Sequence, residues 1–125
     1  MSLNVYLEGP AETSACECVQ CGNEHTKMTR PTYYAANYTH NCGTMAAAAD
    51  IYEYIWRPDE NGITTAAQLI EPLRAGIAAM KADPEKFRTF DPPNGWGSYA
   101  TFLPWVEAYL AACEDHPDAT VSVSR

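Results

Sequence analysis

The chain has 125 residues, of which 46 % are hydrophobic and 19 % are charged, as in an ordinary globular domain with a modest core. Its formal net charge is −8 and it contains no run of basic residues, so direct binding to nucleic acid is disfavoured. No segment approaches the roughly 20 apolar residues that span a bilayer, and the first residues do not resemble a secretory signal. We therefore predict a single domain, residues 1–125, in the cytoplasm, with reduced cysteines and no membrane association.

A short strand is predicted at each end of the chain. Leu3, Val5 and Leu7 alternate with polar residues, and Val121 and Val123 do the same near the other end. An isolated two-stranded ribbon is marginal in water. The two end strands are therefore expected to pair in one small sheet.

The segment after the first strand is rich in cysteine. Cys16, Cys18, Cys21 and His25 follow one another as C-x-C-x2-C-x3-H, and Gly22 allows the backbone to turn directly after Cys21. A Cys-x-x-Cys-Gly knuckle of this kind binds zinc and normally joins two short strands. We predict those strands at residues 13–17 and 24–29, which would extend the sheet to about four strands.

A structural zinc ion is the expected cofactor, with ligands drawn from the knuckle and from a later histidine: Cys18, Cys21, His25 and His40. The fourth ligand stays open, because four ligands within ten residues would crowd, and Cys16 or Cys42 are the other candidates. The alternatives are surface thiols without metal, a redox pair, and a catalytic zinc with a bound water. Gly22 disfavours the redox pair, because that motif normally opens a helix.

The next stretch, residues 30–56, is interpreted as the central helix of the molecule. At 100° per residue, one stripe of it contains Tyr38, Cys42, Met45, Ala49, Tyr52 and Trp56. Asn37, His40 and Asn41 lie beside this stripe near the start of the helix. Because buried amides must be hydrogen-bonded, these three residues indicate either local capping or a site for a small polar ligand.

Shorter helices are predicted in the second half of the chain. A segment at residues 66–70 should break at Glu71, because proline suits the first turn of a helix, and a new helix should run over residues 72–82. Another short helix should begin near Pro84. Ser98 is expected to cap the last helical region, whose main part covers residues 104–114.

The ligand site is predicted to combine the polar start of the central helix with an arginine and a glycine-rich loop: Asn37, His40, Asn41, Arg57, Asn94 and Trp96. Trp96 lies between two glycines and offers a stacking surface, and Arg57 is suited to a carboxylate or phosphate. In the alternative interpretation, Trp56 and Trp96 fill the core and Arg57 pairs with a neighbouring acid, Asp59 or Glu60. No catalytic sequence motif is present, so whether the chain is an enzyme stays open.

The segments ANYTHNCGTMAAAADIYEYIWRPDENGI, PPNGWGSY and PDATVSVSR resemble a group of small proteins encoded by bacteriophages and by bacteria that carry prophages. The resemblance covers most of the chain and lies in an A-N-x-T-H-N segment, a W-R-P-D-E turn and an N-G-W-G loop. It implies a phage or prophage accessory protein, acting in the cytoplasm of an infected or lysogenic cell. It implies no activity or substrate.

The predicted fold class is α+β, with a small antiparallel sheet, formed by the end strands and the zinc-knuckle hairpin, packed against a helical bundle. The preferred function is a zinc-stabilised binding module that recognises a small polar molecule or a host or phage protein. One alternative is a small hydrolase that uses zinc or His40 as a base. Another is a purely structural or interaction protein that presents an exposed face, such as that of Tyr33, Tyr34 and Trp105.

Overall fold

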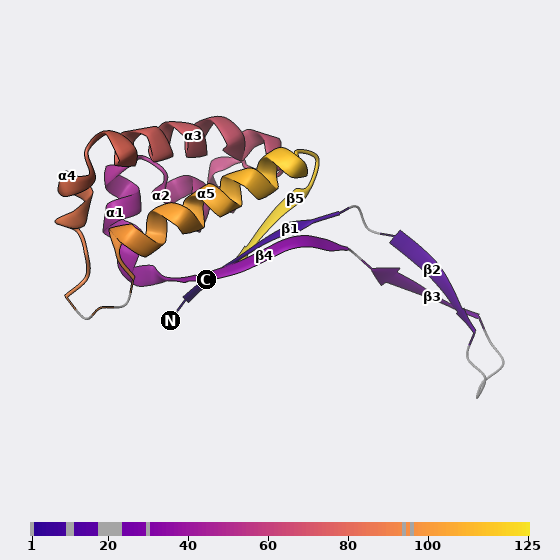
Figure 1. The fold of residues 1–125 in the computed structure, drawn as a ribbon. Helices are drawn as coiled ribbons and strands as arrows, with labels where there is room; N and C mark the ends of the chain where they lie inside the picture. Colours follow the sequence, from indigo (N-terminus) through magenta and orange to yellow (C-terminus); the bar gives the residue numbers. More distant parts are fainter. Residues whose placement is uncertain (1, 10–11, 18–23, 30, 94, 96) are drawn as a thin grey trace.

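The computed structural model describes residues 2–9, 12–17, 24–29, 31–93, 95 and 97–125 (Figure 1). Its central sheet has three antiparallel strands in the order β4-β1-β5. These are β1 (Ser2–Glu8), β4 (Thr32–Thr39) and β5 (Thr120–Ser124). The predicted pairing of the two end strands is confirmed, since Val5 lies opposite Val123 in the β1–β5 ladder.

The cysteine-rich segment forms a hairpin, as predicted, but not as part of this sheet. β2 (Glu12–Glu17) pairs with β3 (Glu24–Thr29) in a separate two-stranded sheet. The predicted extension of the sheet by these two strands is wrong, and the third strand of the main sheet is β4, which pairs with β1. β1 and β2 follow each other in the chain, as do β3 and β4, and these two segments pair at two places, as β1 with β4 and as β2 with β3. Between the two ladders, Gly9 N donates to Pro31 O (2.7 Å).

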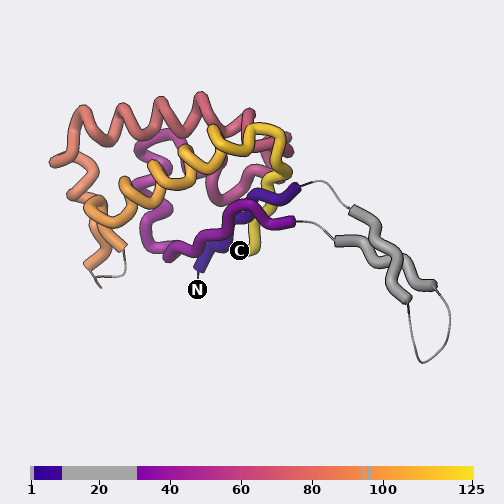
Figure 2. Tube along the Cα trace, turned by 45° about the vertical axis from the view of Figure 1, so that its right-hand side comes forward, coloured from indigo at the N-terminus to yellow at the C-terminus, as the bar shows by residue number. Residues whose placement is uncertain are grey.

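The helices gather on one face of the three-stranded sheet (Figures 1 and 2). In chain order they are η1 (His40–Cys42), α1 (Gly43–Ala48), α2 (Tyr52–Trp56), η2 (Pro58–Asn61), α3 (Ala67–Ala82), α4 (Pro84–Arg88) and α5 (Tyr99–Asp115). The alternating pattern of β1 explains this arrangement, because Leu3, Val5 and Leu7 are fully buried against the helices. The predicted α+β fold class is confirmed. No helix in the described part of the chain is long and apolar enough to cross a membrane.

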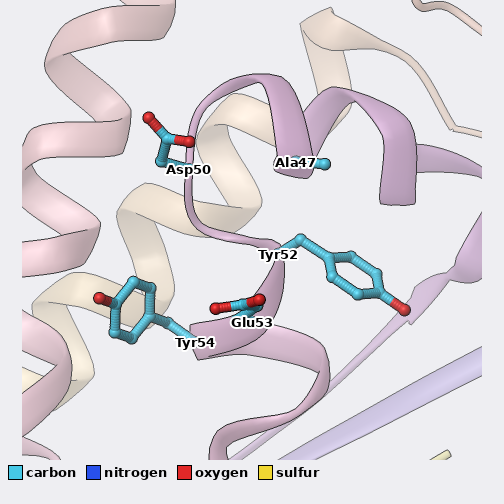
Figure 3. A pocket seen from close by; sticks show the side chains of 5 residues that line it. All are labelled: Ala47, Asp50, Tyr52, Glu53 and Tyr54. Carbon is cyan, nitrogen blue, oxygen red and sulfur yellow. The ribbon is translucent and has the colours of Figure 1, made fainter. Parts of the chain in front are cut away.

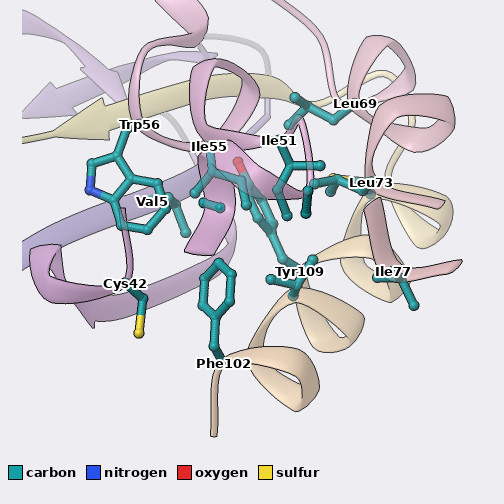
Figure 4. Close-up of a cluster of buried hydrophobic side chains, with 14 of the residues drawn as sticks. Val5, Cys42, Ile51, Ile55, Trp56, Leu69, Leu73, Ile77, Phe102 and Tyr109 are labelled. Carbon is teal, nitrogen blue, oxygen red and sulfur yellow. The ribbon is translucent and has the colours of Figure 1, made fainter. Parts of the chain in front are cut away.

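One hydrophobic core lies between the sheet and the helices (Figure 4). Its largest fully buried side chains include Trp56, Tyr109, Phe87 and Phe102. Leu73, Ile77 and Met80 form the inward side of α3, since all three are buried.

The predicted central helix over residues 30–56 is wrong, because its first third is the strand β4 and the rest is divided between η1, α1 and α2. Tyr34, Ala36 and Tyr38 point toward the core at every second position, which is the period of a strand. The residues at spacings of four and three do not form one helical stripe. They are core residues of separate elements, such as Cys42 in η1 and Trp56 in α2.

α1 ends where a single helix was expected to continue. Asp50 has a left-handed backbone (φ 60°), and the amides of Asp50 and Ile51 donate to Ala47 O (3.1 Å) and Ala46 O (2.9 Å). This pair of bonds satisfies free carbonyls at the helix end, as in a Schellman motif. The change of chain direction at Asp50 buries Ile51 against α3. Ile51 packs closely on Gly76 there, because glycine has no side chain.

The prolines were predicted to start helices, and this is wrong for two of them. Pro72 and Pro104 are each the sixth residue of a continuous helix, α3 and α5. Each removes one backbone hydrogen bond, while buried residues on both sides, such as Leu69 and Leu73 in α3, keep the helix packed. The predicted helix at Pro84 and the cap at Ser98 are confirmed, the latter as a capping box with Thr101.

Candidate functional site

His40 lies directly after β4, in the first turn of η1, and is bound to the core. Trp56 Nε1 donates to His40 Nδ1 at 2.8 Å, and Trp56 is only 2 % exposed. An indole N–H is always a donor, so Nδ1 must be the unprotonated nitrogen, and the proton of the neutral imidazole lies on Nε2. A role for His40 as a general base, or as a ligand through Nδ1, therefore requires the Trp56 bond to break.

The two asparagines of the predicted site are not buried amides. Asn37 is exposed on the sheet face opposite the helices, where its Nδ2 donates to Ser2 Oγ and Asn4 Oδ1, both at 2.9 Å. Asn41 is also exposed, and its backbone N–H donates to Thr39 Oγ1 (3.3 Å), which caps η1. The premise that their side chains occupy the core is wrong. Asn37 belongs to the strand β4, whose alternate residues face outward, and Asn41 is exposed in η1.

Arg57 behaves as the alternative interpretation predicted. Its Nη1 lies 3.0 Å from Glu60 Oε2, while Asp59 pairs instead with Arg125 Nη1 at 2.7 Å. Arg125 also donates to Trp56 O (2.9 Å), so the end of β5 is connected to the end of α2. The two remaining residues of the predicted ligand site, Asn94 and Trp96, lie outside the described residues.

The structure describes the positions of two of the four predicted metal ligands, His25 and His40. Cys18 and Cys21 lie outside the described residues, and His25 is in β3, with its Cα opposite that of Cys16. His40 follows the far end of β4, whose eight residues stand between it and the hairpin side of the chain. Cys42 is fully buried, and burial raises the pKa of its thiol, which disfavours the thiolate that zinc requires. Within the described part of the chain, no three His, Cys, Asp or Glu residues are arranged to hold a metal ion.

A concave surface occurs beside the reversal between α1 and α2, at a place that sequence reasoning missed. It has a volume of about 380 Å³ and is lined by Ala47, Asp50, Tyr52, Glu53 and Tyr54. Asp50, Glu53 and Tyr54 lie on one side of it, and the ring of Tyr52 points the other way (Figure 3). The available signal was Asp50 after four alanines, because aspartate tolerates the left-handed conformation that ends a helix.

Tyr52 connects this concave surface with the predicted site. Its ring stacks on Trp56, with centroids 5.4 Å apart and an angle of 14° between the planes. Hydrogen bonding to Tyr52 and, to a smaller extent, to Glu60 raises the pKa of Arg57. His40 and Arg57 thus lie around the Tyr52–Trp56 stack, whereas Asn37 is on the outer face of the sheet.

Comparison of the chain with protein-family models, with curated proteins and with solved structures found no match. The fold defines an α+β protein with a separate two-stranded hairpin.

Proposed function

We propose that this chain is a zinc-stabilised binding module, of phage or prophage origin, that contacts a host or phage protein through the β2–β3 hairpin. The observation that carries the proposal is the separation of the two sheets: among the described residues, β2 and β3 pair with each other and not with the sheet that supports the core. The phage origin rests on the sequence resemblance alone.

A hairpin of this kind needs a further source of stability, because a two-stranded ribbon is marginal in water. The β2–β3 register supports a metal at its end, since Cys16 and His25 have directly opposed Cα atoms. Cys18 and Cys21 follow in the sequence between these strands. Together they supply four ligands that zinc accepts, and binding of zinc contributes directly to folding free energy.

This ligand set replaces His40 by Cys16. His40 is occupied by Trp56 and is separated from β3 by the whole of β4, whereas Cys16 lies in the hairpin itself. Zinc closed by four protein ligands is structural rather than catalytic. Its role here is to hold the two strands together, so that the hairpin presents a constant surface to the partner protein.

Elemental analysis of the purified, reduced protein tests the proposal. We expect about one zinc ion per chain, and a Cys18→Ser/Cys21→Ser variant should lose it. Cys113→Ala is the matched control: Cys113 is buried in the main core and burial raises its pKa to about 12, so its removal should leave the zinc content unchanged. Absence of metal from the reduced wild-type protein would refute the zinc assignment.

The role of the hairpin in binding is tested separately. Wild-type protein and the Cys18→Ser/Cys21→Ser variant, each with the same affinity tag, should be compared for stable capture of a protein from host or infected-cell extract. We expect capture by the wild type and its loss both in the variant and after zinc is removed by a chelator. Equal capture by all three would assign binding to another surface.

A second candidate function, binding of a small polar molecule, is favoured by the concave surface between α1 and α2. Its size, about 380 Å³, suits a small ligand, and it combines the ring of Tyr54 with the carboxylates of Asp50 and Glu53. Tyr54→Ala should abolish any saturable ligand shift seen by NMR, and Asn41→Ala, at the originally predicted site, should not. The opposite result would return the ligand site to the start of η1.

A further inference from the structure

The two edges of the three-stranded sheet differ in how they are covered. Beside β5, Val121 N donates to Thr64 O and Ala66 N donates to Ala119 O, both at 2.9 Å, and Thr65 forms a bridge with Thr120. Beside β4, none of the described residues forms a backbone hydrogen bond with its outer side. Half of the backbone groups of an edge strand point away from the sheet, so β4 presents a row of donors and acceptors to another strand.

Within the described residues, β4 also lacks the features by which sheet edges usually avoid pairing. Charged side chains, proline within the strand, short length or a covering segment normally protect an edge. β4 is eight residues long, and its sequence TYYAANYT contains neither a charged residue nor proline. Although the net charge of the chain is −8, a second copy can approach along β4 without facing a like charge on that strand.

Aromatic side chains follow this edge on the helix side of the sheet. Tyr34 stacks on Tyr109 at 5.8 Å, and Tyr38 lies 5.3 Å from Trp105, which in turn lies 5.8 Å from Tyr109. Tyr34, Tyr38 and Trp105 are only partly buried. Trp105 Nε1 is buried without a hydrogen-bond partner among the described residues. Half-buried aromatic residues beside open backbone groups have the composition of an interface centre.

We propose that two copies of this chain pair antiparallel along β4, forming one continuous six-stranded sheet across a two-fold axis. The order of the inward-facing residues of β4 is symmetric about Ala36, with a tyrosine on each side, Tyr34 and Tyr38. With the axis at Ala36, Tyr34 lies opposite the partner's Tyr38 on both sides, and only alanine side chains meet at the centre. Aromatic cross-strand pairs stabilise such ladders, and six strands is a usual sheet size.

The same axis fixes the pairing on the outer face. There, Ala35 lies opposite the partner's Asn37, and both residues are exposed in the single chain. These positions accept charged residues without disturbing the core. They allow the register itself to be tested, and the test does not involve the β2–β3 hairpin on which the proposed function rests.

Sedimentation equilibrium of the full chain tests the proposal. The wild type should have twice the chain mass of 13.8 kDa. Ala35→Lys/Asn37→Lys places like charges opposite each other twice across the axis and should weaken the dimer roughly tenfold or more. Ala35→Glu/Asn37→Lys places opposite charges in the same positions and should retain the dimer. Ser122→Lys/Ser124→Lys on β5 is the control, with the same added charge away from β4, and should also dimerise.

A wild-type protein that stays monomeric at its highest soluble concentration would overturn the proposal. A dimer equally weakened by the two β4 variants would overturn the register, and one equally weakened by the β5 control would overturn the β4 interface. Circular dichroism of each variant shows whether the fold is retained. The Cys18→Ser/Cys21→Ser protein should dimerise like the wild type, which separates failure of the hairpin proposal from failure of this one.

Discussion

The hydrogen bond between Trp56 and His40 allows a quantitative test of the structural role assigned to His40. His40→Ala removes the acceptor of a buried indole N–H, since Trp56 is 2 % exposed and its bond to His40 Nδ1 measures 2.8 Å. A buried donor left unpaired costs about 1–3 kcal/mol. For a chain of this size, 1 kcal/mol corresponds to roughly 4 °C in Tm, so the variant should melt roughly 4–12 °C below the wild type.

The measurement is a urea titration followed by circular dichroism, supported by thermal melts. Asn41→Leu is the matched control, because Asn41 is adjacent and exposed and its contact with Thr39 runs through the backbone. That variant should stay within about 0.5 kcal/mol of the wild type. If His40 is instead kept free for a ligand, His40→Ala should be as stable as Asn41→Leu.

A double-mutant cycle distinguishes the lost hydrogen bond from lost packing. Trp56→Phe removes the donor and keeps an aromatic ring, so His40→Ala in that background should cost less than in the wild type. The difference between the two costs should lie in the range of about 0.5–3 kcal/mol that directly contacting residues show. An identical loss in both backgrounds would refute the reasoning, because the destabilisation would then have nothing to do with the indole N–H.

Three further predictions concern the core and the end of the chain. Gly76→Ala should destabilise by about 1 kcal/mol in a denaturant titration, despite the better helix propensity of alanine, because the added methyl meets the buried Ile51 Cγ2; a more stable variant would contradict the close packing. The hydrogen bond from Arg125 lowers the pKa of Asp59, so this pair stabilises the fold above about pH 4 and loses its effect as the pH falls below that value. Asp59→Asn should therefore melt below the wild type at neutral pH and equal it near pH 2, and a pH-independent difference would exclude this charge effect. Tyr109→Phe should leave stability unchanged or raise it by up to about 2 kcal/mol, since the buried hydroxyl has no partner among the described residues; a clear loss in the thermal melt would show that the hydroxyl is bonded.

Local patterns were sufficient wherever a segment carried its own signal. The alternation of Leu3, Val5 and Leu7 predicted β1, and the knuckle spacing predicted both strands of the β2–β3 hairpin. Ser98 was predicted as a cap because its side chain bonds to a backbone amide within the same turn. These features depend on neighbours within a few residues, so the sequence contains their cause.

The ligand site was predicted wrongly because it depends on contacts between residues far apart in the chain. Residues 34–38 fit both a strand and a helix by spacing, and pairing with β1 decided for the strand. That choice placed Asn37 outside, brought His40 to Trp56 and left Asn41 in solvent.

The sequence by itself determined where strands and caps begin, because hydrogen bonds and side-chain alternation over short distances specify them. Only the tertiary structure decided which strand lies beside β1, which polar residues find partners and which edge stays open. The physical reason is that β pairing, the burial of Trp56 and the approach of Ile51 to Gly76 join residues far apart in the chain. These long-range interactions stabilise the fold only once the core has formed.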